Sequence, residues 1–168
     1  QMPDHKHTFV SVGIDLVGLV LYPYHSLVAI ISLMRIEGGV RVDVYSDKID
    51  SARVSRVAAV LEKRAGLRFS DQDIYINVAG GVRLKESAID GALAAALYSA
   101  RTDLPLPENA AIVGELSLAG EIRPVNRIKQ RSKAASGLGY STVLAPEKEE
   151  GVTCVKDIKS LIKALFSK

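Results

Sequence analysis

The sequence predicts a single domain that mixes α-helices and β-strands, and three observations predict it. The 168 residues are 48% hydrophobic, which is enough apolar material to bury one sizeable core. Strand-type and helix-type segments alternate along most of the chain, without internal repeats or low-complexity linkers. The single cysteine, Cys154, excludes an intrachain disulfide framework and the cysteine-rich zinc sites.

An apolar run at residues 16–34 has His25 as its only titratable side chain. The run meets the bare length criterion for a transmembrane helix. However, the motif YPYHS interrupts it, and its β-branched and aromatic residues are typical of hairpins of buried strands. We therefore expect strands here and no membrane insertion. The preceding residues, QMPDHKHTF, carry no signal-peptide pattern.

Two further strands, LVAIISLM and GGVRVDVY, are predicted around a turn at residues 37–39. A helix follows, with Ser51 as its cap and Gly66 as its closing residue. The apolar face of this helix recurs at one-face spacing, at Val54, Val57, Ala58 and Leu61. Alternation in DIYINV then predicts a half-buried strand that ends at Gly80 and Gly81. The alanine content of ALAAALYSA predicts another helix.

The second half of the chain continues the alternation. AIVGELSLAGEIRPV predicts two short strands around a turn at Ala119 and Gly120, and STVLAP predicts a buried strand before the acidic loop EKEEG. Two helices are predicted from one-face spacing, the first at Ile128, Arg131, Ala135 and Leu138 and the second at Ile158, Leu161, Ile162 and Leu165. In VTCV, we interpret Cys154 as a packed side chain rather than a nucleophile.

Metal and nucleotide sites find little support in the residues. His5 and His7 lie in a terminus that looks irregular, His25 lies in a turn motif, and no acidic helix pair accompanies them, so we expect no metal site. The chain also lacks a glycine-rich phosphate loop that ends in Lys-Ser or Lys-Thr. We therefore expect no cofactor in this domain.

Ser87 allows two interpretations. As a nucleophile it would need a base, and without a usable histidine the candidates are Lys85 and Lys129, kept neutral by burial. As a helix cap, it lies three residues before Asp90, which is the spacing of a capping box with a shorter acid. The residues favour the cap.

Two motifs, VLEKRAGL and GELSLAGEIRPV, lie at a spacing that resembles the Lon-protease-like carboxy-terminal domain of bacterial RadA (Sms) DNA repair proteins. The resemblance covers roughly residues 51–146 and is weaker over residues 26–45. It implies a Lon-like domain at residues 26–168, preceded by an unassigned segment at residues 1–25 that is either a foreign remnant or an altered strand. The implied fold is α+β, Lon proteolytic-domain-like (ribosomal protein S5 domain 2-like), with mixed sheets and packed helices.

The resemblance also locates the catalytic dyad of active Lon proteases in this sequence. Counted from GELSLAGEIRPV without gaps, the nucleophile position falls on Ala88 and the lysine position on Arg131. Alanine has no nucleophilic atom, and an arginine side chain stays protonated at physiological pH. The resemblance therefore implies a domain that is not an enzyme. The alternative is an active Ser-Lys peptidase that uses shifted residues such as Ser87 and Lys129.

Basic residues concentrate near these positions, although the formal net charge of the chain is only +3. Five of them lie between Glu121 and Lys133, and two more precede the neighbouring helix. If the fold brings the two segments together, they form a surface suited to sequence-independent contact with DNA phosphates. The alternative is that these residues only form a solvated helix face without a ligand. The predicted DNA-binding residues are Arg83, Lys85, Arg123, Arg127, Lys129, Arg131 and Lys133.

Further expectations come from the resemblance alone. The KNRFG motif, the zinc-binding cysteines and the ATPase core of RadA proteins are absent from this sequence. The resemblance thus implies a longer, cytoplasmic protein, a DNA-dependent ATPase that binds ATP and zinc in its amino-terminal parts. Its implied partners are DNA during branch migration, a recombinase and further copies of itself in a hexamer, with no membrane.

Overall fold

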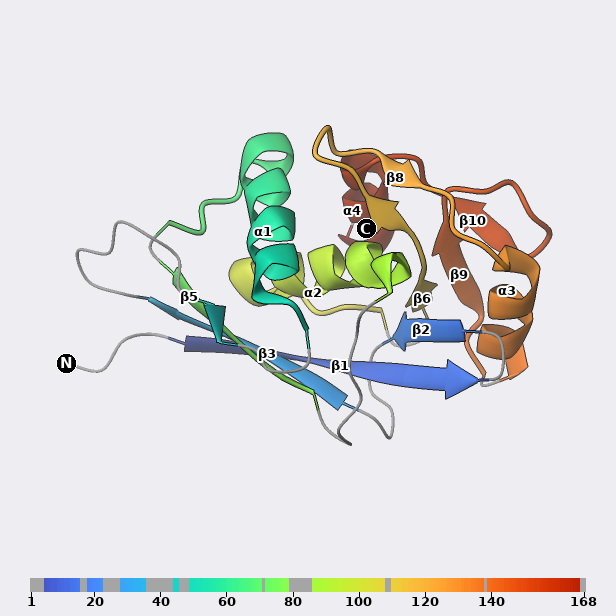
Figure 1. Cartoon of the computed structure of the whole chain (residues 1–168), viewed down its shortest axis with the longest axis horizontal. Helices are drawn as coiled ribbons and strands as arrows, with labels where there is room; N and C mark the ends of the chain where they lie inside the picture. The colour runs from blue at the N-terminus through green and yellow to red at the C-terminus, as the bar shows by residue number, and fades with distance from the viewer. Residues whose placement is uncertain are drawn as a thin grey trace.

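The computed structural model describes residues 5–15, 18–22, 28–35, 44–45, 49–70, 72–78, 86–107, 110–137 and 139–166. These residues form an α+β fold, as predicted, in which helices pack on a mixed sheet (Figure 1). The sheet has eight strands in the order β10-β9-β6-β2-β1-β3-β5-β4. The bounds of these strands are β1 His5–Asp15, β2 Gly18–Tyr22, β3 Val28–Arg35, β4 Val44–Tyr45, β5 Gln72–Val78, β6 Ala110–Ile112, β9 Thr142–Ala145 and β10 Val152–Cys154.

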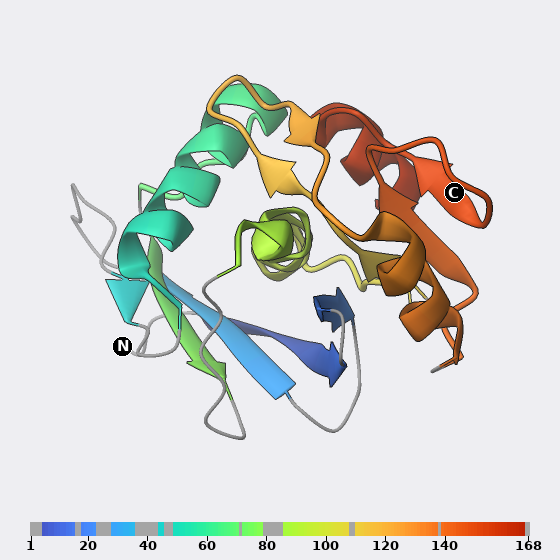
Figure 2. The same cartoon turned by 45° about the vertical axis from the view of Figure 1, so that its right-hand side comes forward.

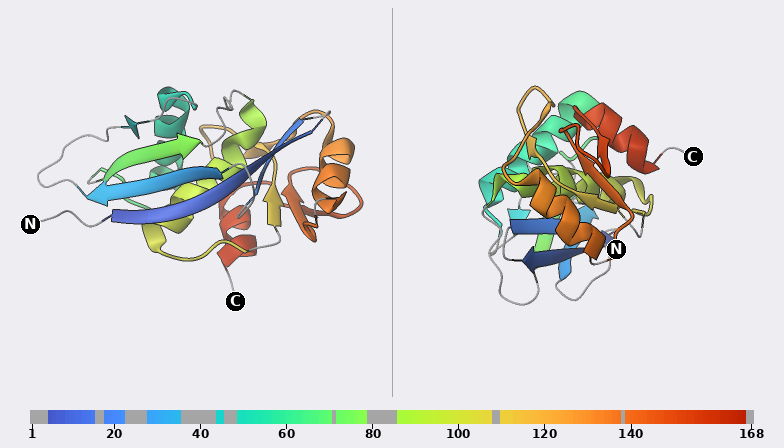
Figure 3. Two further views of the ribbon diagram at one scale, coloured as in Figure 1. Left: turned by 90° about the horizontal axis from the view of Figure 1, so that it is seen from below. Right: turned by 90° about the vertical axis from the view of Figure 1, so that its right-hand side faces the viewer.

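The sheet consists of an antiparallel part and a parallel part. Strands β2, β1, β3 and β5 pair antiparallel, whereas β6, β9 and β10 pair parallel. A short antiparallel contact between β2 and β6, with Leu21 opposite Ile112, joins the two parts. Seen from below in Figure 3, β1, β3 and β5 lie in front of the helices, so the helices cover the opposite face of this part of the sheet.

The order of the strands corrects two predicted hairpins. The apolar run at residues 16–34 does supply strands β2 and β3, but β1 lies between them. The strand at Val44–Tyr45 pairs parallel with β5 rather than with β3. His5 and His7 lie in β1 rather than in an irregular terminus. Among the described residues, no helix is both long enough and apolar enough to cross a membrane.

The cap of helix α1 (Ser51–Ala65) lies one residue before the predicted one. The carboxylate of Asp50, not the hydroxyl of Ser51, accepts the hydrogen bond from the Ala52 N–H at 3.1 Å. Gly66 closes the helix with a left-handed φ of 70°, as predicted. The predicted strand DIYINV matches β5, and Gly80 and Gly81 lie outside the described residues.

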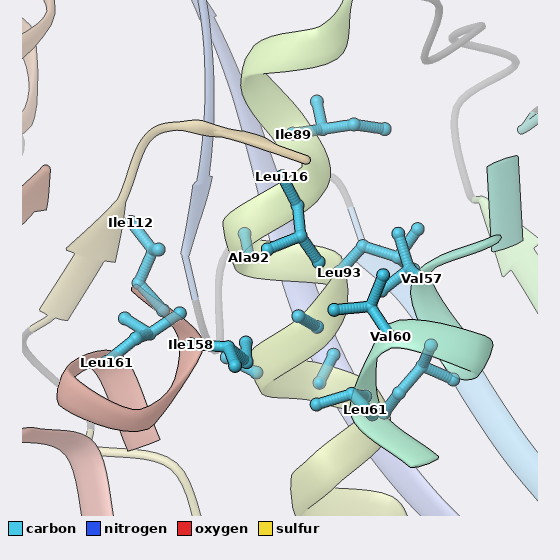
Figure 4. Packing of buried hydrophobic residues seen from close by; sticks show 14 of the residues in the cluster. Val57, Val60, Leu61, Ile89, Ala92, Leu93, Ile112, Leu116, Ile158 and Leu161 are labelled. Carbon is cyan, nitrogen blue, oxygen red and sulfur yellow. The ribbon is translucent and has the colours of Figure 1, made fainter. Parts of the chain in front are cut away.

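Helix α2 (Asp90–Thr102) lies at the centre of the fold and follows a short 3-10 helix, η2 (Ser87–Ile89). Nearly every residue of α2 is buried, because α1 and α4 (Ile158–Phe166) pack against it from two sides and the sheet from a third. Figure 4 shows Val57, Val60 and Leu61 of α1 and Ile158 and Leu161 of α4 directed toward this helix. The one-face spacings that predicted α1 and α4 are therefore confirmed.

A second, smaller apolar cluster lies beneath α3 (Ile128–Gly137). It joins α3 to β6, β9 and the start of η2, and its buried members are Ala88, Ala111, Val113, Ala135, Tyr140, Val143 and Ala145. The predicted hairpin is confirmed as β7 (Glu115–Leu116) and β8 (Ile122–Arg123), and Leu138 lies outside the described residues. Cys154 is exposed on β10, so its prediction as a packed side chain was wrong, because β10 is the edge strand of the sheet.

Candidate functional site

The structure places Ala88 and Arg131, the two predicted dyad positions, at the junction of η2, α2 and α3. Ala88 is 2% exposed and belongs to the small apolar cluster beneath α3. Its carbonyl oxygen accepts a hydrogen bond from the Gly114 N–H at 3.0 Å, which fixes η2 against the segment between β6 and β7. Arg131, on α3, is also 2% exposed. The predicted helix face of Ile128, Arg131 and Ala135 does face inward.

The buried side chain of Arg131 is bound by several hydrogen-bond acceptors. Its Nη2 forms an ion pair with Glu86, the residue directly before η2. Its Nε donates to the carbonyl oxygen of Asn126 at 3.0 Å, and Nη2 also lies 3.2 Å from the Asn126 side-chain oxygen. The guanidinium thus connects the start of α3 with the segment that leads into η2.

A second carboxylate lies near this guanidinium. Burial raises the pKa of Glu147 above its ordinary value, while backbone N–H groups of Glu147 and Val125 and the charge of Arg131 oppose the rise. The two positions that the resemblance assigns to the dyad thus hold a buried methyl group and an arginine that is paired with Glu86 and influences the charge of Glu147. The side chains of Ala88 and Arg131 supply neither a serine nucleophile nor a lysine base.

Ser87 does not cap a helix, so that prediction was wrong. The N-cap positions of η2 and α2 are Glu86 and Ile89, and neither makes a side-chain capping hydrogen bond. Asp90 is instead fully buried and accepts from Arg53 Nη1 at 2.7 Å and from the Leu116 N–H at 3.0 Å.

Ser87 is one of the residues that line a cleft of about 520 Å³ between α1 and the β7–β8 hairpin. The described residues that line this cleft include three arginines but no lysine and no histidine. The arginines are Arg53 and Arg56 of α1 and Arg123 of β8. Sequence reasoning missed the α1 pair, although residues three apart on a helix lie on one face and SARVSRV contains this spacing.

The predicted basic surface is only partly present among the described residues. Arg123, Arg127, Lys129 and Lys133 are exposed, and the last three lie at the start and on the outer face of α3. Arg131 faces inward and is paired, so the structure removes it from the predicted DNA-binding set. Arg83 and Lys85 lie outside the described residues. We name the surface formed by Arg127, Lys129 and Lys133 the α3 basic face.

A protein-family comparison matches residues 42–149 of the chain, well over half of it, to the family described as subunit ChlI of Mg-chelatase. The chain belongs to this family. Among the described residues of this ChlI-family chain, no three His, Cys, Asp or Glu side chains gather as they would around a metal ion.

Curated relatives of this ChlI-family chain are DNA repair proteins named RadA. The protein from Treponema pallidum (strain Nichols) is 69% identical over 103 residues, which is 61% of this chain and 23% of the relative. The protein from Streptococcus pneumoniae (strain ATCC BAA-255 / R6) is 47% identical over 112 residues, or 66% of this chain and 27% of the relative. The protein from Rickettsia typhi (strain ATCC VR-144 / Wilmington) is 39% identical over 121 residues, which is 68% of this chain and 27% of the relative. The chain contains a RadA-related region and spans about a quarter of the length of these relatives.

Proposed function

We propose that this chain is a non-catalytic, Lon-protease-like domain of a RadA-type DNA repair protein, which contacts DNA without sequence preference through the α3 basic face. One observation carries the proposal. On the same helix, Arg131 is buried against Glu86, while Lys129 and Lys133 are exposed on the other side. The helix that carries the catalytic lysine in active Lon proteases here has an arginine in that position and presents its lysines to the solvent.

Absence of the dyad supports the non-catalytic role. The alternative peptidase would pair Ser87 with a neutral lysine, and a lysine loses its proton at neutral pH only when it is desolvated or near other cations. Lys129 and Lys133 are exposed, and the cleft lined by Ser87 contains arginines instead. Those arginines stay charged and do not serve as bases.

The α3 basic face suits phosphates rather than bases of DNA. Lysine and arginine contacts to the backbone release condensed counterions, which makes such binding strong at low salt and indifferent to sequence. No aromatic residue occurs between Asn126 and Gly139, so stacking on exposed bases finds no support in this helix. The proposed ligand is therefore the duplex backbone.

Wider roles follow from the relatives, which are named as DNA repair proteins. We propose that this domain also helps to assemble a hexamer during branch migration, within a longer cytoplasmic protein. That protein would be a DNA-dependent ATPase with ATP and zinc bound in its other parts, and a recombinase would be its partner. A ring of such domains could both assemble and hold DNA against its basic surfaces.

The test is a titration of this chain with duplex DNA at two salt concentrations, with its mass in solution measured on the same sample. We expect salt-sensitive binding, and we expect Lys129→Glu and Lys133→Glu each to weaken it and to lower the slope of log K against log salt by about one unit. The matched control is Lys163→Glu, which makes the same change of charge at an exposed residue of α4. Equal losses in all three variants, or none in any, would remove the α3 basic face from the proposal.

A peptidase assay separates the alternative. Hydrolysis of a fluorogenic peptide by the unaltered chain, abolished in Ser87→Ala and in Lys129→Ala, would establish the peptidase and end the non-catalytic proposal. We expect no hydrolysis above background.

A further inference from the structure

A second positively charged site lies on the other side of the β7–β8 hairpin from α3. In Figure 2, the hairpin arches over the end-on helix α2 and separates α1 from α3. The cleft between α1 and the hairpin has a volume of about 520 Å³, within the range of small-ligand sites. Arg53 and Arg56 of α1 form one wall and Arg123 belongs to the other, and Ser87 and Ser117 also line the cleft.

Two of these arginines have donors to offer a ligand. Arg56 Nη2 lies 3.6 Å from Asp90, a long ion pair that engages one nitrogen, and its side chain is 40% exposed. Arg123 Nε lies 3.9 Å from Glu121, and its side chain is 59% exposed. Each guanidinium has five N–H donors in a planar fork that matches phosphate oxygens. The two ion pairs engage one nitrogen of each guanidinium, so most of its N–H donors can still bind a ligand.

Charge balance in the cleft favours an anion. Arg53 forms the shorter ion pair with buried Asp90, at 2.7 Å, and its charge compensates that of the carboxylate. The only acid among the described lining residues is Glu115, which lies directly opposite Arg123 in the hairpin register. Among the lining residues three arginines therefore face one acid, and Asp90 and Glu121, which pair with these arginines, do not themselves line the cleft.

The walls of the cleft are fixed before any ligand arrives. A Cβ added at Gly120 would lie 3.0 Å from Cγ of Arg64, so the hairpin turn lies directly against α1. The Gly120 carbonyl oxygen accepts from the Ile158 N–H at 2.9 Å, and the Leu116 N–H donates to Asp90. A preformed site loses little affinity to the ordering of its own groups.

We infer that this cleft binds a phosphate group, held by Arg56 and Arg123 from opposite walls. The inference goes beyond the proposed function, because the α3 basic face can contact DNA whether or not the cleft is filled. Phosphate in this position has two sources. It belongs either to a nucleic-acid backbone that continues from the α3 basic face past Arg123, or to a free phosphorylated ligand.

The experiment titrates the ¹⁵N-labelled chain with inorganic phosphate and, in parallel, with pyrophosphate, at constant low ionic strength. We expect saturating amide shifts at Ser87 and at residues 117–119, with an affinity at least about tenfold weaker in Arg56→Ala. Lys63→Ala, an exposed residue on the same helix outside the cleft, is the matched control and is expected to change nothing. Because Arg56 also lies near Asp90, Arg123→Ala on the opposite wall provides a second variant in case the first fails to fold.

Duplex DNA titrated into the same variants identifies the source. Weaker DNA binding in Arg56→Ala and Arg123→Ala assigns the phosphate to the DNA backbone, whereas unchanged DNA binding with weakened phosphate binding assigns it to a free ligand. If neither variant changes the affinity for any of the three probes, the inference is overturned. Lys129→Glu distinguishes this failure from failure of the α3 basic face, since that variant should lose DNA affinity but keep the phosphate shifts in the cleft.

Discussion

Arg131 on α3 forms an ion pair with Glu86, the residue directly before η2, and the pair joins the two segments on which the resemblance to Lon proteases predicts the dyad positions. The guanidinium also bonds to Asn126 at the start of its own helix. These contacts of Arg131 therefore position α3 against the residue before η2.

Replacement of Arg131 by alanine should destabilise the fold. The change leaves Glu86 and the Asn126 carbonyl without their charged donor, and removal of one partner from a buried ion pair costs about 3–5 kcal/mol. The side chain of Glu86 is 36% exposed, so water recovers part of that loss and we expect about 2 kcal/mol. Urea unfolding measures the change.

A double-mutant cycle with Glu86→Gln isolates the pair from the rest of the change. We expect an interaction free energy of about 1 kcal/mol or more between the two positions, since residues in direct contact are not additive. If the two variants add, the ion pair contributes nothing measurable, and the role of Arg131 reduces to packing.

Restoration of the dyad side chains should not restore proteolysis. In the double variant Ala88→Ser and Arg131→Lys, the new lysine would lie near the acceptors that Glu86 and Asn126 now provide to the arginine, and near the charge of Glu147. Nearby carboxylates favour the charged form of a lysine, and a charged lysine does not accept the proton of a serine. Hydrolysis of a fluorogenic peptide by this variant would show instead that two side chains alone separate this domain from a peptidase.

Asp90 should be the acid whose loss costs the most stability among the described residues. It is fully buried and holds Arg53 of α1 and the Leu116 N–H of β7 against the start of α2. Asp90→Ala leaves both donors without this acceptor, and we expect a cost of about 3–5 kcal/mol in the free energy of unfolding. Glu150→Ala, in the exposed loop before β10, is the control and should change stability by less than about 0.5 kcal/mol. Similar costs in the two variants would deny Asp90 this role.

The elements that sequence predicted well are those set by local pattern. Helices α1 and α4 each bury one face against α2, so their apolar residues recur at helical spacing. The order of the strands could not be predicted from local pattern. Parallel pairing of β4 with β5, and insertion of β1 between β2 and β3, depend on contacts between distant segments that no short window of sequence contains.

The candidate site shows the same limit in its side chains. The spacing of Ser87 and Asp90 is that of a capping box, but distant groups on α1 and β7 bind the carboxylate of Asp90 instead. Helical periodicity did place Arg131 on the face of Ile128 and Ala135, which the structure confirms as the inner face. A count of charges along the chain does not distinguish an inner arginine from an outer one, so Arg131 was wrongly included in the basic surface.

Gly114 should not tolerate a side chain. A Cβ at this position would lie 2.4 Å from Cγ2 of Ile122, which is itself buried between the hairpin and the core. We expect Gly114→Ala to destabilise the chain by about 1–3 kcal/mol through overpacking. At Gly137, the last residue of α3, a Cβ meets nothing within 4 Å, so Gly137→Ala should be neutral or stabilising by about 0.5 kcal/mol. Thermal unfolding of both variants tests the contrast, and equal effects would contradict the close packing of the hairpin.

The cap of α4 should make stability depend on pH at the acidic end. Asp157 accepts from the Ser160 N–H at 2.7 Å and from the Ser160 hydroxyl, and these two hydrogen bonds lower the pKa of its carboxyl below the ordinary 3.8. Because the folded-state pKa is the lower one, this stabilisation is fully present above the unfolded value and is lost as the pH falls through the folded value. At pH 7 we expect Asp157→Ala to cost about 1 kcal/mol as a lost N-cap. Urea unfolding from pH 7 down to pH 2 should show the unaltered chain and the variant converging as the carboxyl is protonated; a difference that persists at pH 2 would assign the effect to packing rather than to the charged cap.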